Sequence, residues 1–331
     1  LVVATIIVSN LLGASDVLSW SRGLGFAIIM LSMVPLTGYG GQISLAPMAF
    51  AGLGVVAMGQ WGADGNPLGL LLAFLLPAAV GALVALPALR LRGIYLALAT
   101  FAFAVFMERA IFSQDAVFPS GSRRVDRLQL FGLKFESDRA YMVLLAVVFA
   151  LIGIGVAWLR LGRFGRRLMA MKDSPAACAT LGLNLTVTKL QVFALSAGIA
   201  GIGGAMFGGL QKNVSVAQFD AIQGLPIVLM AVAGGIALVS GSLVGGLLYA
   251  AFPIISKSVP SLANFLLIAP GLIGISLGRN PNGMVNDIGT RIREARHRRE
   301  LRGAVDADEA EEKQPLLPLG GPVYDAESVG L

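Results

Sequence analysis

Residues 67–88, PLGLLLAFLLPAAVGALVALPA, form a continuous apolar stretch that carries no charged side chain. At about 1.5 Å per residue, a helix of this length crosses the roughly 30 Å of hydrocarbon in a bilayer. A strand of a membrane barrel would alternate apolar and polar residues, and this stretch does not. The stretch therefore predicts a transmembrane helix.

The composition extends this prediction to the whole chain. Hydrophobic residues make up 56% and charged residues 13% of the 331 residues, whereas soluble domains contain roughly 25% charged residues. We expect spans at 1–12, 23–37, 44–60, 67–88, 93–113, 141–160, 188–210, 222–252 and 261–278. The predicted fold is an all-α polytopic membrane helix bundle of about nine to ten spans, with broken helices and a cytoplasmic helix between spans.

The positive charges predict the orientation of the chain in the membrane. The net charge is +6, and basic residues gather between the spans ending at 160 and starting at 188, where Asp173 is the one acid. Loops rich in Lys and Arg stay in the cytoplasm, so orientation in the membrane explains the positive charge. We therefore expect membrane lipid as a partner and no nucleic acid. We predict a multi-pass transmembrane domain over 1–288, with a cytoplasmic segment at 161–187, and a disordered charged cytoplasmic tail over 289–331.

Two glycine-rich positions predict breaks in the helices. The span at 222–252 is too long for one crossing, and glycines at Gly234, Gly235 and Gly241 interrupt it. Each glycine lowers helix propensity by about 1 kcal/mol, and the two basic segments on its flanks need an even number of crossings between them. We therefore predict two helices or half-helices that meet between Gly234 and Gly241. A similar break lies at residues 37–44, where an ordinary short turn is an equal alternative.

Few residues could carry catalysis. The one histidine, His297, lies in the charged tail, Cys178 is the one cysteine, and no Gly-Lys-Ser or Gly-Lys-Thr sequence of a phosphate-binding loop occurs. Ser-His and metal-His sites inside the membrane are excluded, as is ATP hydrolysis by this chain alone. We expect no catalytic residue, no metal and no cofactor in this chain.

The segment at 161–187 combines basic residues with a helix start signal. Asp173-Ser174-Pro175 offers an N-cap at Asp173 or Ser174 followed by proline in the first turn, and Gly182 would end a short helix over 176–181. A short cytoplasmic helix with small side chains suits a cleft on a partner protein. A helix held on the membrane surface by its arginines is the alternative.

Several motifs in this order resemble those of permease subunits of branched-chain amino acid ABC importers. Residues 38–45, GYGGQISL, and 49–54, AFAGLG, resemble the signature of that family, and 96–103, LALATFAF, resembles its next motif. Residues 165–184 resemble its cytoplasmic coupling segment, 189–205 the helix that follows, and 233–235 with 241–246 its broken helix pair. The resemblance covers about residues 20–285 and is stronger to the second, M-type permease than to the first.

The resemblance implies a permease subunit in the cell (plasma or inner) membrane that imports branched-chain amino acids by alternating access. It implies four kinds of partner: a second homologous permease, two cytoplasmic ABC ATPases that bind ATP and Mg, an external substrate-binding protein, and lipid. It places Gly40, Gly41, Gln42 and Ser44 along the translocation path. The predicted break adds Gly234 and Gly235, because a broken helix at membrane depth has to line a cavity or pack in protein. The resemblance places Arg166, Arg167, Lys172, Asp173, Ala177 and Gly182 at the ATPase, with the coupling segment at 161–187.

The sequence departs from the family pattern at the coupling helix. Pro175, Cys178 and Ala179 stand where the family often has acidic residues, so packing has to carry more of the contact with the ATPase. Two alternatives stay open at this stage. They are an ABC permease for urea or short-chain amides, which shares these motifs, and a secondary transporter that needs no ATPase.

Overall fold

The computed structural model describes residues 1–11, 13–88, 91, 93–130 and 133–258. The predicted span at 261–278, the tail over 289–331 and His297 lie outside the described residues. The helices are α1 Val2–Leu11, α2 Ala14–Leu31, α3 Pro47–Trp61, α4 Pro67–Ala88, α5 Ile94–Phe106, α6 Asp138–Leu161, α7 Arg163–Asp173, α8 Pro175–Thr180, α9 Leu185–Gln211, α10 Gly224–Gly235 and α11 Val239–Ser258. Two π-helical segments, η1 Val34–Tyr39 and η3 Met107–Phe112, continue α2 and α5.

Short elements complete the described chain. They are the 3₁₀ turns η2 Ala63–Gly65, η4 Pro119–Gly121 and η5 Val216–Phe219, and the strands β1 Ser122–Arg124, β2 Gln129–Leu130, β3 Leu133–Lys134 and β4 Asn213–Ser215. The prediction of an all-α bundle is confirmed, since the strands have only two or three residues each.

Five stretches of helix are long and apolar enough to cross a membrane: Asp16–Tyr39, Pro67–Pro87, Ile94–Phe112, Asp138–Leu161 and Leu185–Gln211. They match the spans predicted at 23–37, 67–88, 93–113, 141–160 and 188–210. The first begins several residues earlier than predicted, because α2 starts at Ala14 and continues past the polar side chains of Asp16 and Arg22. Helices α1 and α3 are shorter, with 10 and 15 residues, and the count of about nine to ten spans stays a prediction.

The region predicted as one interrupted span at 222–252 is two helices. Helix α10 ends at Gly235 and α11 begins at Val239, which confirms the predicted break between Gly234 and Gly241. Gly235 adopts a positive φ of 111°, and the backbone N–H groups of Leu238 and Gly241 are satisfied within the turn, at 3.0 Å from the carbonyl oxygens of Gly235 and Leu238.

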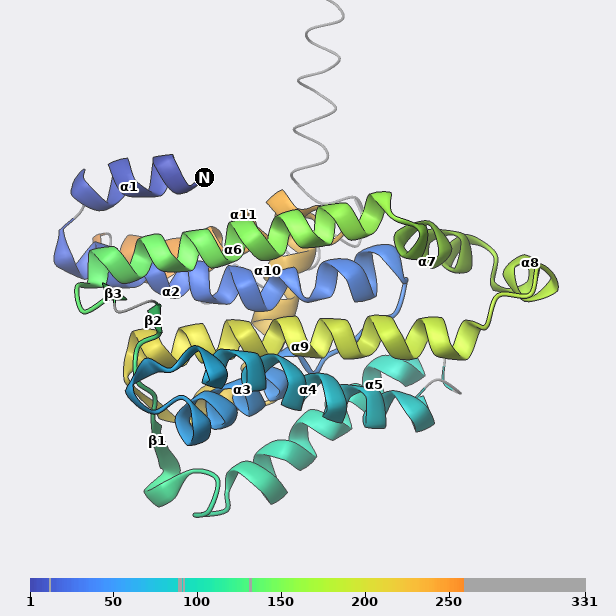
Figure 1. Ribbon diagram of the computed structural model, residues 1–331, viewed down its shortest axis with the longest axis horizontal. Helices are drawn as coiled ribbons and strands as arrows, with labels where there is room; N and C mark the ends of the chain where they lie inside the picture. Colours follow the sequence, from blue (N-terminus) through green and yellow to red (C-terminus); the bar gives the residue numbers. More distant parts are fainter. Residues whose placement is uncertain (12, 89–90, 92, 131–132, 259–331) are drawn as a thin grey trace, which may run out of the picture. The chain divides into compact units, whose positions relative to one another are not determined.

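Helix α9 lies at the centre of the packing, against α2, α3 and α4. In Figure 1, α2 lies between α9 and α6, and α6 packs mainly on α2. A Cβ on Gly54 of α3 would lie 2.6 Å from the Cα of Gly201, and a Cβ on Gly204 would lie 2.6 Å from the Cα of Ala51. Backbones this close exclude any side chain at either glycine, as expected where small residues face each other on neighbouring membrane helices.

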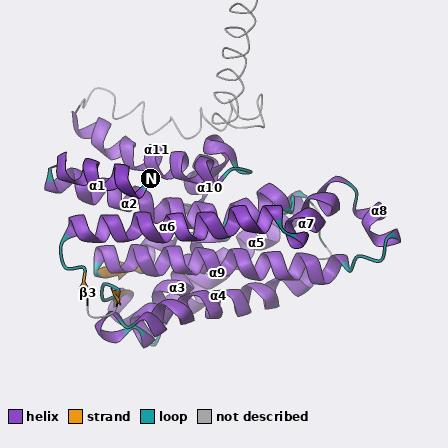
Figure 2. Ribbon diagram, turned by 45° about the horizontal axis from the view of Figure 1, so that its top comes forward, coloured by secondary structure: helices purple, strands orange, loops and turns teal. Residues whose placement is uncertain are grey.

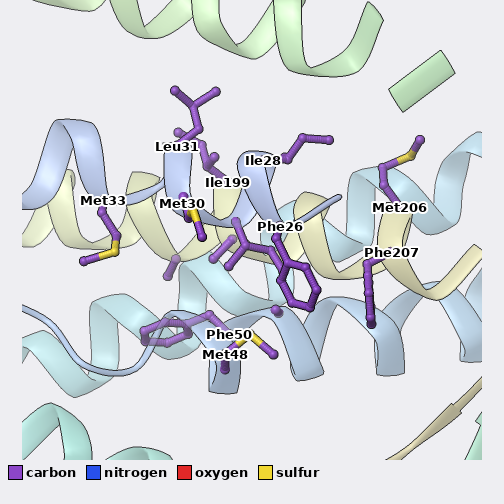
Figure 3. Packing of buried hydrophobic residues seen from close by; sticks show 14 of the residues in the cluster. Phe26, Ile28, Met30, Leu31, Met33, Met48, Phe50, Ile199, Met206 and Phe207 are labelled. Carbon is purple, nitrogen blue, oxygen red and sulfur yellow. The ribbon is translucent and has the colours of Figure 1, made fainter. Parts of the chain in front are cut away.

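Large apolar side chains fill the space between α2, α3 and α9. Figure 3 shows Phe26 and Met30 of α2, Phe50 of α3, and Met206 and Phe207 of α9 in this core. All of them are at most 8% exposed. The core holds the centre of α2 in place, and α2 leads into the first predicted break.

Helices α7 and α8 lie at one end of the bundle and the strands at the other (Figure 1). At the strand end, β1 pairs antiparallel with β4, with Arg123 opposite Val214. The buried Arg123 guanidinium donates hydrogen bonds to the carbonyl oxygen of Val117 and to Oε1 of Gln60. Burial lowers the pKa of Arg123. Glu108 of η3 ties the same end together, since its Oε2 accepts a hydrogen bond of 3.1 Å from the Ala221 N–H.

Candidate functional site

The first predicted break is a non-helical stretch between η1 and α3. Residues 40–46 follow the π-helix, and Gly41 adopts a φ of +64°, which favours glycine. The Thr37 hydroxyl donates to the carbonyl oxygen of Gln42 at 2.9 Å, and the Leu45 N–H donates to the hydroxyl of Thr100 at 2.9 Å. Irregular backbone at membrane depth needs such partners, because no water is there to replace them.

The two breaks touch each other. A Cβ on Gly38 would lie 2.9 Å from the Cα of Ala237 and closer still to the carbonyl oxygen of Ile236. Gly38 belongs to η1, and Ile236 and Ala237 belong to the turn between α10 and α11. The breaks at 37–46 and 236–238 therefore form one junction, although about 200 residues of chain separate them.

The predicted coupling segment forms two helices. Ser174 caps α8, with its Oγ accepting a hydrogen bond of 3.4 Å from the Ala177 N–H, and Pro175 occupies the first turn as predicted. Gly182 follows α8 with a φ of +80°. Apart from the buried Cys178, every residue of α8 is exposed, and α8 stands at the tip of its end of the bundle (Figure 2).

Lys172 of α7 links this segment to the first break. Its Nζ donates a hydrogen bond of 3.0 Å to the carbonyl oxygen of Gly38. Its side-chain carbons pack so close to Gly41 that a Cβ there would lie 2.9 Å from Lys172 Cγ. A second basic residue, Arg160 at the end of α6, lies 5.7 Å from the centre of the Tyr39 ring, in a cation–π contact. The end of α6 and the end of α7 thus each contact the first break.

The structure brings together some predicted residues and separates others. Gly40, Gly41 and Gln42 line a cavity of about 180 Å³ together with Lys172 and Lys189. Gln42 is 6% exposed, and its Nε2 has no hydrogen-bond partner in the part of the chain that the structure describes. This cavity therefore presents a buried donor beside two amines.

The other predicted path residues are buried in packing. The Ser44 hydroxyl accepts a hydrogen bond of 3.3 Å from the Ala46 N–H, inside the break. Gly234 packs against Gly241, where a Cβ on Gly234 would lie 2.9 Å from the Gly241 carbonyl carbon, and Gly235 lies at the turn itself. Their assignment to a translocation path stays a prediction.

The predicted ATPase contacts lie on the surface of the α7–α8 end. Arg166, Arg167, Asp173, Ala177 and Gly182 are exposed. Arg166 also donates a hydrogen bond of 2.9 Å to the carbonyl oxygen of Leu161, which fixes the turn between α6 and α7. Exposure alone does not establish that these residues bind an ATPase, so their docking role stays a prediction.

Sequence reasoning missed two residues of the junction. Thr100 of α5 holds the break by accepting a hydrogen bond from the Leu45 N–H. Its signal was one of two hydroxyl side chains, with that of Tyr95, inside the apolar run at 94–106. Gly38 allows the contact between the breaks, and no pattern in the sequence pairs it with Ile236. A larger cavity of about 810 Å³ at the strand end was also missed, and side chains of both signs line it, including Asp126, Arg127 and Lys212.

The sequence is similar to known membrane transport proteins. Residues 21–274 match the model of the family described as branched-chain amino acid transport system / permease component. The chain is 30% identical over 296 residues to the high-affinity branched-chain amino acid transport system permease protein LivM of Salmonella typhimurium, covering 80% of this chain and 66% of that protein. It is 32% identical over 244 residues to the protein of the same name from Escherichia coli, covering 64% of this chain and 55% of that protein. The chain thus spans less than two-thirds of the length of either relative, and no solved structure matches it.

Proposed function

The chain belongs to the family of branched-chain amino acid transport system permease components, and on that premise we propose that it is the membrane subunit of an ABC importer. It moves branched-chain amino acids inward by alternating access, and partner ATPases that hold ATP and Mg supply the energy. The chain is itself a transport subunit with helices that could span the membrane.

One series of contacts carries the proposal. Lys172 at the end of α7 is hydrogen-bonded to Gly38, and Gly38 packs on Ile236 and Ala237. A displacement of α7 therefore reaches both helix breaks through directly packed groups. Packed junctions respond to such displacements by switching between discrete arrangements, which is what alternating access requires.

The α7–α8 end suits the cytoplasmic face and the ATPases. Its basic residues favour retention in the cytoplasm, and we assign the tail beyond 288 to the same face. The exposed side of α8 offers Ala176, Ala177, Ala179 and Thr180, none of which is charged. Contact with an ATPase then depends on shape at α8 and on the charges of Arg166, Arg167 and Asp173 of α7. Lys172 of the same helix holds the Gly38 carbonyl instead.

The strand end then faces outward, where an external binding protein delivers the substrate. The charged cavity of about 810 Å³ lies there, and its mixture of cations and carboxylates suits a polar and reversible protein contact. A second permease subunit completes the membrane part. The exposed apolar side chains along α4 and α6, such as Leu83, Leu151 and Ile154, suit contact with that subunit or with lipid.

Among substrates, a branched-chain amino acid is favoured because both relatives carry that description in their names. The same comparisons do not favour the alternatives of urea, short-chain amides or an ATPase-independent transporter.

Uptake of labelled leucine and of labelled urea tests this proposal, in cells that contain or lack this chain. We expect leucine uptake to depend on the chain and on ATP hydrolysis by copurifying subunits. Loss of urea uptake with intact leucine uptake would refute the substrate assignment. Leucine uptake that persists when the ATPases are inactivated would refute the coupling.

A further inference from the structure

A second cavity, of about 240 Å³, opens between α2, α3, α9, α10 and α11. It lies away from α7, because its lining includes Arg22 near the start of α2 and Gln211 at the end of α9. The α7 contact at Gly38 lies at the opposite end of the α2–η1 helix, about 24 Å from Arg22 at about 1.5 Å per residue. The cavity is therefore separate from the junction described above.

The floor of this cavity is apolar and aromatic. The ring of Phe26 lies 4.9 Å from that of Phe207 and 4.5 Å from that of Tyr249, centre to centre. Ile227 of α10 and Met48 of α3 add aliphatic surface. Figure 3 shows Phe26, Met48 and Phe207 projecting from three different helices into the same region. Such a floor suits a branched aliphatic side chain.

The rim of the cavity is polar and carries one positive charge. Gln211 and Gln218 lie there with a hydrogen bond of 3.5 Å between them, and Gln223 lies beside them at the start of α10. Arg22 supplies the charge. None of the ion pairs found in the described ranges includes Arg22, and Arg22 lies within a helix apolar enough to cross the membrane. The Arg22 side chain is exposed, so its guanidinium is accessible at the mouth of the cavity.

We propose that this cavity is a binding site for an α-amino acid with a branched aliphatic side chain. This proposal rests on the function proposed above. Arg22 binds the α-carboxylate through its planar, bidentate donor group. The amide oxygens of the glutamines accept hydrogen bonds from the α-ammonium group. Phe26, Phe207 and Tyr249 hold the side chain. The volume of about 240 Å³ lies below the roughly 300 to 1,000 Å³ of sites for drug-sized ligands, as a small amino acid requires.

Binding of radiolabelled leucine to the complex purified through a tag on this chain tests the proposal, without the external binding protein. Leucine amide, which lacks the carboxylate charge, serves as competitor. We expect the wild-type complex to prefer leucine at least tenfold. Arg22→Gln should lose about tenfold or more in leucine affinity and little in amide affinity, because the lost hydrogen bonds are to a charged group. Arg22→Lys should keep part of the preference.

Arg109→Gln is the matched control, since Arg109 is 78% exposed and lies outside the cavity. It should bind leucine as the wild type does. Equal loss of leucine and amide binding in Arg22→Gln, or no loss of either, would overturn the site. If Arg22→Gln does not assemble, Ile227→Phe decides, because the larger ring fills the floor and should weaken leucine binding at least tenfold. Unchanged leucine affinity in that variant would also overturn the site.

The same samples separate the two proposals. A wild-type complex that supports no leucine uptake refutes the proposed function. A wild-type complex that transports leucine, with an Arg22→Gln variant that binds and transports it equally well, refutes this site alone.

Discussion

Replacing Gly38 by alanine should push the two helix breaks apart. The added Cβ would lie 2.9 Å from the Cα of Ala237, whereas ordinary contact begins at 3.4 Å. The turn between α10 and α11 must then move by at least 0.5 Å (3.4 − 2.9), and further to clear the carbonyl oxygen of Ile236. Both neighbours are backbone, so no side chain can rotate out of the way.

The free-energy cost of the added methyl group is partly offset by the higher helix propensity of alanine. Overpacking a well-packed site costs about 1 to 3 kcal/mol, and alanine returns up to about 1 kcal/mol relative to glycine inside a helix. With the full return from alanine the net cost is up to about 2 kcal/mol. A cost of about 1.4 kcal/mol within that range shifts the population of the closed junction tenfold.

Leucine uptake and ATP hydrolysis by the complex in proteoliposomes measure this effect. We expect Gly38→Ala to lower uptake by about tenfold while ATP hydrolysis continues. Gly155→Ala is the matched control, because Gly155 lies in the interior of α6 and a Cβ there meets nothing within 4 Å. Uptake at the wild-type rate in Gly38→Ala, or an equal loss in Gly155→Ala, would refute the reasoning.

Three further substitutions test neighbouring contacts. Lys172→Gln removes the charged donor to the Gly38 carbonyl and should lower leucine uptake several-fold more than Lys172→Arg does, with ATP hydrolysis retained. Gly182→Val places a β-branched residue at a φ of +80°, a strain of about 1 to 3 kcal/mol, and should reduce copurification of the ATPases, whereas Gly182→Asn should be tolerated. Thr100→Val leaves the Leu45 N–H without its acceptor at a cost of about 1 to 3 kcal/mol. The melting temperature of the complex should fall, and Thr100→Ser should restore it.

Local signals in the sequence were enough to predict the break near Gly235 and the start of α8, whereas a break at 37–44 was no better supported than an ordinary turn. Glycine propensity and span length placed the break between Gly234 and Gly241, where the structure has it. The Ser174-Pro175 signal predicted the start of α8, because capping and the fixed φ of proline act over only a few residues. These features depend on neighbours along the chain, which the sequence displays directly.

Contacts between distant segments could not be predicted in this way. Lys172 was assigned to the ATPase from the family pattern alone, and its bond to Gly38 spans 134 residues. Arg22 was missed for another reason. Hydropathy ends a span at the first polar residues, so the predicted boundary at residue 23 left Arg22 outside the helix that contains it. A polar residue that faces a cavity does not end a helix, and hydropathy alone cannot distinguish that case.

The pairing of β1 with β4 sets an order for biosynthesis. Arg124 pairs with Asn213, and the whole of α6, α7, α8 and α9 lies between them in the chain. Contacts between such distant segments form late, since the intervening loop must close first. The strand β1 therefore waits, with unpaired backbone groups, until α9 has been inserted and β4 has emerged beside it. A ribosome stalled before residue 213 would leave this end of the molecule open, and proteolysis of such truncated chains would be expected to cut within residues 113–130.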